Sequence, residues 1–260
     1  MTIAAVVVTA SAQELTNDQR EAYLKSAQVV RTKTLSMGVT GSLKAALSDG
    51  TLQHDAHIQT IDEYKSRFEG SRGAEINFRD SYKYNIAAYR IARLLDLNMV
   101  PPSVERKVDG KSGAVTWWVD NVMMTELDRF KSKQEAPDKN AWNKQMGVVM
   151  VFDELIYNTD RNLGNLVITK DWQIWMIDHT RGFRWNKTCP KLKTMKQIDR
   201  KLLANLKKLT REELTERCGQ YLMKPEIEGV LARRDAIVKH FEARMAAEGE
   251  GTVLYELARR

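Results

Sequence analysis

The chain has 260 residues, of which 43% are hydrophobic, with a formal net charge of +7 and a sequence isoelectric point of about 9.3. No apolar run approaches the length of a membrane-spanning helix, and the two cysteines, Cys189 and Cys218, are too isolated for a metal cluster or a disulfide framework. The basic charge suits an anionic ligand, whether a nucleotide, a phospholipid headgroup or an acidic protein.

Residues 1–20 are expected to form an N-terminal arm or the end of a truncated export signal. A short apolar run is followed by Ala10-Ser11-Ala12, which has the A-x-A pattern of a signal cleavage site. The basic region that precedes such a run is missing, so an ordinary apolar arm is the alternative. The localisation stays open between export and the cytoplasm.

Residues 29–35 and 43–47 are expected to form two strands joined by a loop that contains glycine. The loop glycines would let backbone N–H groups approach phosphate oxygens, and its hydroxyl groups would add donors. An ordinary hairpin turn explains the same residues, and the loop is not a Walker A loop because no Gly-Lys-Ser/Thr follows. The candidate phosphate-binding residues are Gly38, Thr40, Gly41 and Ser42.

The Asp49-Gly50 turn predicts a hairpin that leads into a third strand at about residues 54–61. Residues 80–95 then have apolar positions three and four apart and begin with Asp80 as a helix cap, which predicts one long helix. Residues 70–73 are expected to form a flexible insert before that helix.

A last sheet strand is expected at residues 115–119, because Val-Thr-Trp-Trp-Val is rich in β-branched and aromatic side chains. Residues 120–124 would follow as a connector between two lobes. Further on, residues 146–157 are apolar on most faces, as in a buried helix, and residues 166–169 and 172–177 have the pattern of a short hairpin.

The segment between the buried helix and the hairpin carries the clearest chemical signal. Asp160 is followed by Asn165 and, thirteen residues later, by Asp178, and this D-x-x-x-x-N…D spacing is typical of phosphoryl transfer. Asp160 would be the base near an acceptor hydroxyl, and Asn165 and Asp178 would hold Mg²⁺ against nucleotide phosphates. A polar turn is the alternative, because turns favour Asp and Asn.

Residues 158–166, together with Ile177-Asp178-His179, resemble the catalytic loop and metal-binding segment of phosphatidylinositol 3- and 4-kinases. They are also similar to HipA-like bacterial kinases and to secretory-pathway kinases. The Asp-His dipeptide in place of Asp-Phe-Gly fits this branch better than ordinary protein kinases. In element order the resemblance covers about residues 20–245.

This resemblance implies an α+β, two-lobe protein-kinase-like fold. Residues 21–122 would form a nucleotide-binding N-lobe with an antiparallel β-sheet and one long helix. Residues 123–260 would form a mainly helical catalytic C-lobe. In this fold the adenine docks at the connector, so Met123 and Met124 would line an apolar slot for it; the alternative is that both methionines are simple core residues.

The resemblance also implies a phosphate-holding lysine on the third strand and a glutamate on the long helix that pairs with it. Both are missing, and Gln59 and Asn85 occupy those positions, where they would form a neutral hydrogen bond of about the same reach. The phosphate charge would then be met by Lys44, Arg79 or Lys83, each of which has the alternative of a solvated surface charge.

After residue 187 the chain is expected to be helical, with helices at residues 202–208, 211–222 and 226–247 that scaffold the large lobe. Basic residues recur between Lys191 and Lys208. Their spacing is typical of the polar face of a helix rather than of a nucleic-acid-binding surface, so nucleic acid is not an expected partner.

The sequence favours an ATP- and Mg²⁺-dependent phosphotransferase, phosphatidylinositol-kinase-like or HipA-like, that acts on a protein or lipid hydroxyl. Loss of the lysine–glutamate pair leaves two alternatives: a pseudokinase or binding module without transfer, and transfer of an adenylyl group. Asp160, Asn165 and Asp178 are all present, which favours activity. No part of the sequence identifies the acceptor.

Overall fold

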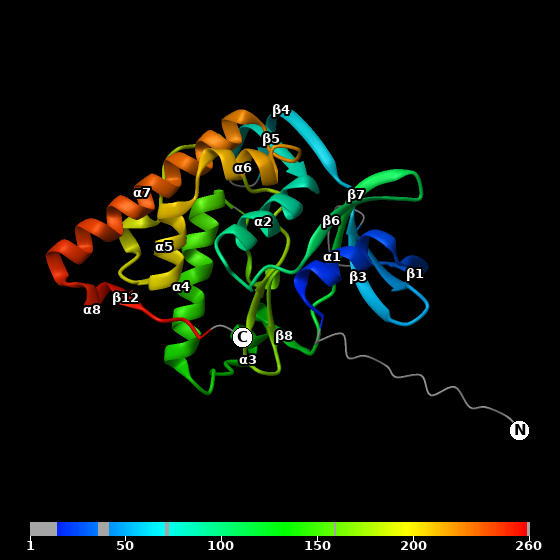
Figure 1. The fold of residues 1–260 in the computed structure, drawn as a ribbon, viewed down its shortest axis with the longest axis horizontal. Coiled ribbons are helices and arrows are strands. Elements are labelled where there is room, and N and C mark those ends of the chain that lie inside the picture. Colours follow the sequence, from blue (N-terminus) through cyan, green and yellow to red (C-terminus); the bar gives the residue numbers. More distant parts are fainter. Residues whose placement is uncertain (1–14, 36–41, 71–72, 159, 259–260) are drawn as a thin grey trace, which may run out of the picture.

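The computed structural model describes residues 15–35, 42–70, 73–158 and 160–258 (Figure 1). It has a lobe built around a β-sheet and a lobe built mainly from helices, with one long helix between them. The A-x-A motif and the loop residues Gly38, Thr40 and Gly41 lie outside the described residues.

The first lobe contains a five-stranded antiparallel sheet in the order β1-β2-β3-β7-β6, with α1 (Asn17–Ser26) packed on one face. Along β3 the side chains alternate, so that Ala56 and Ile58 join the core under α1 while His57 and Gln59 point to the opposite face. That opposite face looks towards the second lobe. The strands are β1 (Gln28–Thr34), β2 (Leu43–Ser48), β3 (Gln53–Gln59), β6 (Ser103–Val108) and β7 (Lys111–Trp117).

The predicted hairpin turn at Asp49-Gly50 is confirmed. Gly50 has a φ of 92°, which favours glycine, and the Asp49 carboxylate accepts hydrogen bonds from the backbone N–H groups of Thr51 and Leu52. These bonds fix the register in which Leu47 lies opposite His54. The sequence did not indicate β6, which closes the far edge of the sheet.

The expected insert at residues 70–73 lies at the tip of a β-hairpin, because Gly70 ends β4 (Asp62–Gly70), Gly73 begins β5 (Gly73–Ser81) and these two glycines pair; residues 71–72 are outside the described residues. The strand β4 is polar and mostly exposed, so its sequence lacks the alternation of a half-buried strand. The predicted cap at Asp80 is wrong, since Asp80 pairs within β5 and α2 (Lys83–Leu94) begins after Tyr82.

Helix α2 lies between the sheet and the helical lobe (Figure 1). Its apolar face, including Ala88 and Ile91, belongs to the large core of the second lobe. Its polar side is held by α1, where the Tyr89 hydroxyl donates to Glu21 at 2.8 Å and Arg90 pairs with the same carboxylate at 3.1 Å. The helix therefore fixes the two lobes relative to each other.

Residues 118–121 link the lobes and lead into β8 (Val122–Thr125), which pairs with β9 in a three-stranded sheet of order β10-β9-β8. The expected connector at 120–124 is therefore shorter than predicted. The hairpin of β9 (Leu166–Thr169) and β10 (Ile174–Met176) is confirmed.

The remaining elements surround the helix α4, whose buried face packs against α7. In the described residues no helix combines the length and the apolar composition needed to cross a membrane. The elements are α3 (Glu126–Ser132), α4 (Lys139–Ile156), η2 (Leu163–Asn165), η3 (Leu192–Thr194), β11 (Ile198–Asp199), α5 (Arg200–Lys208), α6 (Arg211–Cys218), α7 (Lys224–Glu248), α8 (Glu250–Val253) and β12 (Leu254–Tyr255).

Arg233 of α7 is completely buried and donates to three main-chain carbonyls, one at the end of α4 and two in residues 184–186. It donates to Leu155 at 2.8 Å, to Arg184 at 3.1 Å and also to Asn186. Burial lowers the pKa of Arg233 to about 10, so the side chain keeps its charge at neutral pH. It thus ties α7 to the end of α4 and to the chain after Asp178.

We expect Arg233→Met to lower the free energy of unfolding by about 1–3 kcal/mol for each carbonyl left without a donor. Urea unfolding measures this change. The matched control is Arg217→Met, because the Arg217 side chain is 58% exposed and should tolerate the change. Equal losses in the two variants would show that the carbonyl contacts of Arg233 do not stabilise the fold.

Candidate functional site

A cavity of about 450 Å³ lies between the sheet of the first lobe and the β9–β10 hairpin of the second. One face of the sheet forms its roof, where the in-register row Ser103, Thr116 and His57 points into it. Apolar residues such as Val100, Val119 and Met176 make up much of the rest of its wall. The predicted site residues that line it are Ser42, Gln59, Asn85, Asn165 and Asp178.

Asn165 and Asp178 meet at this cavity, where the Asn165 Nδ2 atom lies 3.4 Å from the Asp178 Oδ2 atom. The hairpin register explains the approach: Leu166 pairs with Met176, so the residues just outside the two strands come together. Asp178 has a φ of 54°, and its Oδ1 atom accepts a hydrogen bond from the Thr180 hydroxyl at 3.1 Å.

Arg161 holds the loop between α4 and β9 in place. Its guanidinium pairs with Asp153 of α4 at 3.0 Å and donates to the carbonyls of Asn165 at 3.0 Å and Ile177 at 2.6 Å. The two charged side chains are only 10% and 13% exposed, so water competes weakly with these contacts. The interaction therefore joins the segments that carry Asn165 and Asp178.

Asp160 lies in the same loop and is partly exposed. Its Oδ2 atom is 3.6 Å from the Nη1 atom of Arg181, whose Nη2 atom pairs with Glu75 of β5 at 2.9 Å. Arg181 also lies over the ring of Phe78, with 4.8 Å between its Cζ atom and the ring centroid. The β4–β5 hairpin thus orients a positive charge beside the candidate base.

Gln59 and Asn85 both line the cavity, but their hydrogen bonds lead elsewhere. Gln59 donates to the Ser42 hydroxyl at 3.0 Å and accepts from the backbone N–H of Thr60 at 3.1 Å. Asn85 accepts from the backbone N–H of His179 at 2.7 Å. Each amide therefore fixes a segment of backbone or loop that borders the cavity.

His179 itself is fully buried against Phe152. Burial, helped by the nearby positive charge of Arg161, holds the pKa of His179 well below its ordinary value, so the ring is neutral at neutral pH.

The cationic side chains considered for the phosphates have other partners. Lys44 pairs with Asp55 at 2.8 Å and lies over the Trp118 ring, and Lys83 pairs with Asp62 at 2.8 Å. Arg79 lies over the ring of Tyr64. None of these three side chains lines the cavity, and no lysine or arginine is among the described residues that do.

The expectation that Met123 and Met124 line the cavity is corrected by the structure. Both side chains pack against the core of the helical lobe, because their segment pairs with β9 as a strand instead of crossing between the lobes. Val122 and Thr125 of the same strand line the cavity instead.

His57 is a lining residue that sequence reasoning missed. It stands two residues before Gln59 on β3, and this spacing puts both on one face of a strand, which was the available signal. Burial lowers the pKa of His57 from its ordinary value, although the charge of Asp178 acts in the opposite direction.

No protein-family model matches the sequence, and no curated protein matches it either. Solved structures do match. The structure of hydra Fam20 with sugar aligns with a TM-score of 0.70 at 13% identity, over 97% of this chain and 96% of that one. The Golgi casein kinase with Mn/ADP bound aligns with a TM-score of 0.66 at 13% identity, over 92% of this chain and 78% of that one.

The Helicobacter pylori proinflammatory kinase CtkA aligns with a TM-score of 0.52 at 12% identity, over 86% of this chain and 96% of that one. These matches confirm the two-lobe protein-kinase-like fold, with an antiparallel sheet in one lobe and mainly helices in the other. They do not single out the phosphatidylinositol-kinase or HipA branches. The chain has a protein-kinase-like fold.

Proposed function

We propose that this protein is an ATP- and Mg²⁺-dependent phosphotransferase that acts on a protein or lipid hydroxyl. The observation that carries the proposal is the meeting of Asn165 and Asp178 at an interlobe cavity, with Asp160 in the adjoining loop. The similar Golgi casein kinase has Mn/ADP bound, which supports a nucleotide and a divalent cation here as well.

The donor set fits Mg²⁺. Amide and carboxylate oxygens are the hard ligands that this ion prefers, and it commonly binds through one or two protein groups plus water and substrate phosphates. Among the described residues no cluster of three or more acidic, histidine or cysteine side chains forms a metal cage by itself. Asn165 and Asp178 would hold the ion, which would neutralise charge on the phosphates.

The nucleotide would enter with its base in the apolar part of the cavity and its phosphates near Asn165 and Asp178. Ser42 and Gln59 would then border the phosphates together with the loop that contains Gly38, Thr40 and Gly41. Asn85 would act on the site indirectly, because its side chain positions the backbone of His179, the residue after Asp178. Residues 21–122 would form the nucleotide-binding lobe and residues 123–260 the catalytic lobe.

Asp160 would accept the proton of the acceptor hydroxyl while that oxygen forms a bond to the γ-phosphorus. The bond between the γ-phosphorus and the bridging oxygen breaks, and ADP carries away that oxygen. Arg181, oriented by Glu75, would keep a positive charge beside the reacting groups. No side chain of the protein needs to form a covalent intermediate.

One observation favours a second candidate, a nucleotide-binding module without transfer. No described residue that lines the cavity is a lysine or arginine, so the usual phosphate-holding cation has no replacement there. Two histidines, His57 and His179, are among these lining residues, and His179 is fully buried and neutral. Both candidate functions include nucleotide binding, so only ATP turnover, which the phosphotransferase alone would show, separates them.

We expect millimolar ATP with Mg²⁺ to raise the melting temperature, because a ligand at 100 times its Kd stabilises the folded state by about 2.7 kcal/mol. Asp178→Ala should remove the rise, because the metal loses a ligand. The control Asp235→Ala, at a side chain that is 67% exposed on α7, should keep it. A full rise in Asp178→Ala would remove this residue from the site.

Asp160→Ala should keep the ATP-dependent rise and lose at least about 100-fold in ATP turnover, because a base acts on the acceptor and not on nucleotide binding. Release of ADP, followed by chromatography, measures the turnover. Loss of nucleotide binding in this variant would contradict the role of a base. Wild-type protein that binds ATP without turnover would favour the second candidate.

Arg161→Lys should raise the Mg²⁺ concentration needed for half-maximal nucleotide binding by about tenfold, because an ammonium cannot span Asp153 and two carbonyls together. Titration of Mg²⁺ at fixed ATP measures this value. The control is Arg200→Lys, because the Arg200 side chain is 51% exposed. This change should leave the Mg²⁺ midpoint unchanged. An unchanged Mg²⁺ midpoint with reduced stability would mean that Arg161 acts on folding alone.

His57 predicts a pH dependence of nucleotide affinity. An anion beside the ring raises the His57 pKa on binding, so affinity should rise about threefold to tenfold from about pH 7.5 to about pH 5.5 relative to His57→Gln. Calorimetric titration at each pH measures this difference. His240→Gln, a change in a histidine that bonds to Met195 in the helical lobe, should behave like the wild type.

A further inference from the structure

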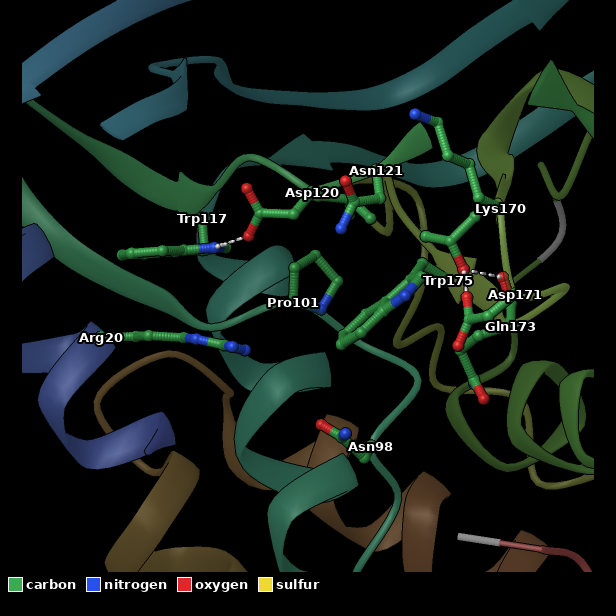
Figure 2. Close-up of a pocket in the computed structure, with 12 residues that line it drawn as sticks. Arg20, Asn98, Pro101, Trp117, Asp120, Asn121, Lys170, Asp171, Gln173 and Trp175 are labelled. Atoms are coloured by element: carbon green, nitrogen blue, oxygen red, sulfur yellow. Dashed lines mark hydrogen bonds between the residues drawn. The ribbon is translucent and has the colours of Figure 1, made fainter. Parts of the chain in front are cut away.

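A second cavity, of about 620 Å³, adjoins the interlobe cavity at the linker between the lobes. Figure 2 shows its lining side chains, which come from α1, from the loop after α2, from the end of β7, from the linker and from the β9–β10 hairpin. Pro101, Trp117 and Val119 line both cavities. Its volume falls in the range of about 300–1,000 Å³ that small-molecule sites occupy.

An indole forms the apolar part of this cavity. Trp175 is half-buried on β10, whereas its strand neighbours Ile174 and Met176 are buried in the core. Figure 2 shows the Trp175 ring beside Pro101, between Asn121 on one side and Asn98 on the other. The face of an aromatic ring is the negative part of its quadrupole and therefore attracts the weakly positive C–H groups of a saturated ring.

The polar part of the cavity carries three carboxamide side chains, each of which can both donate and accept hydrogen bonds. They belong to Asn98, Asn121 and Gln173. In the described part of the chain the Asn121 amide makes no hydrogen bond of its own, and the Gln173 amide donates only to the carbonyl of the next residue, Ile174, at 3.1 Å. These groups suit hydroxyls, which also donate and accept.

The positive and negative charges of the side chains that line this cavity are equal in number. Arg20 and Lys170 contribute two positive charges, and Asp120 and Asp171 contribute two negative ones. Asp120 is held in place, because its two oxygens accept from His54 at 2.9 Å and from the Trp117 indole at 3.2 Å. A site without net charge does not select a phosphate, and a site with this many polar groups does not select a hydrocarbon.

We propose that this linker cavity, defined by Trp175, Asn98, Asn121 and Gln173, is a binding site for a neutral sugar ring. The apolar C–H face of the ring would stack on the Trp175 indole, and its equatorial hydroxyls would bond to the carboxamides and to the Asp120 and Asp171 carboxylates. The proposal does not rest on the phosphoryl transfer proposed above, because the four defining residues do not line the interlobe cavity, although the two cavities share a wall.

Saturation-transfer NMR of the full chain with millimolar D-glucose, D-galactose, N-acetyl-D-glucosamine and myo-inositol tests the proposal. Transfer from aromatic protons to the ring protons of at least one probe is the expected result. Trp175→Ala should weaken that binding about tenfold or more, and Gln173→Ala should weaken it as well.

The matched control is Trp185→Ala, because Trp185 is 44% exposed and lies outside both cavities. It should leave the transfer unchanged. The proposal is overturned if no probe receives saturation, or if Trp175→Ala and Trp185→Ala behave alike. The ATP-dependent rise in melting temperature should persist in Trp175→Ala, so failure of the sugar site and failure of the nucleotide site are separate results.

Discussion

The ion pair between Arg161 and Asp153 is the interaction on which the candidate site depends. The chain leaves α4 and must return along β9 and β10 so that Asn165 and Asp178 face each other. A guanidinium that bonds to the end of α4 and to the carbonyls of Asn165 and Ile177 fixes both ends of that path at once. The fork of donors in arginine is suited to this role, because it reaches a carboxylate and two carbonyls without rearrangement. The register of the β9–β10 hairpin brings the two candidate metal ligands together, and Arg161 attaches both of their segments to α4.

The interlobe cavity has a largely apolar wall, and no lysine or arginine is among the described residues that line it. Arg161 pairs with Asp153, and both Arg181 and Arg184 pair with Glu75 of the β4–β5 hairpin. An anionic nucleotide would therefore depend on the metal, on backbone donors and on His57. The hairpin and the segment after Asp178 form one unit, because the Ser81 N–H donates to the Thr180 carbonyl at 2.9 Å and Arg181 stacks on Phe78.

Sequence reasoning predicted the elements whose signals are local. The β9–β10 hairpin, the buried helix α4 and the Asp49-Gly50 turn each carry their own pattern of turn residues or apolar positions.

Sequence reasoning failed where a partner segment decides the conformation. The polar strand β4 exists because β5 lies beside it, and Met124 is part of a strand because Ile168 offers a pairing edge. The partners of Gln59 and Asn85 were equally hidden, since both amides bond to segments distant in sequence.

The sequence by itself determined which chemical groups are present and in what order: a carboxylate, an amide and a second carboxylate at a spacing that suits phosphoryl transfer, and no lysine at the expected place on β3. Only the tertiary structure decided which groups meet. It brings Asn165 to 3.4 Å from Asp178, turns His57 towards the same cavity and moves Met123 and Met124 into the core. The physical reason is that side-chain direction follows from strand pairing and lobe packing, which depend on contacts between residues far apart in the chain.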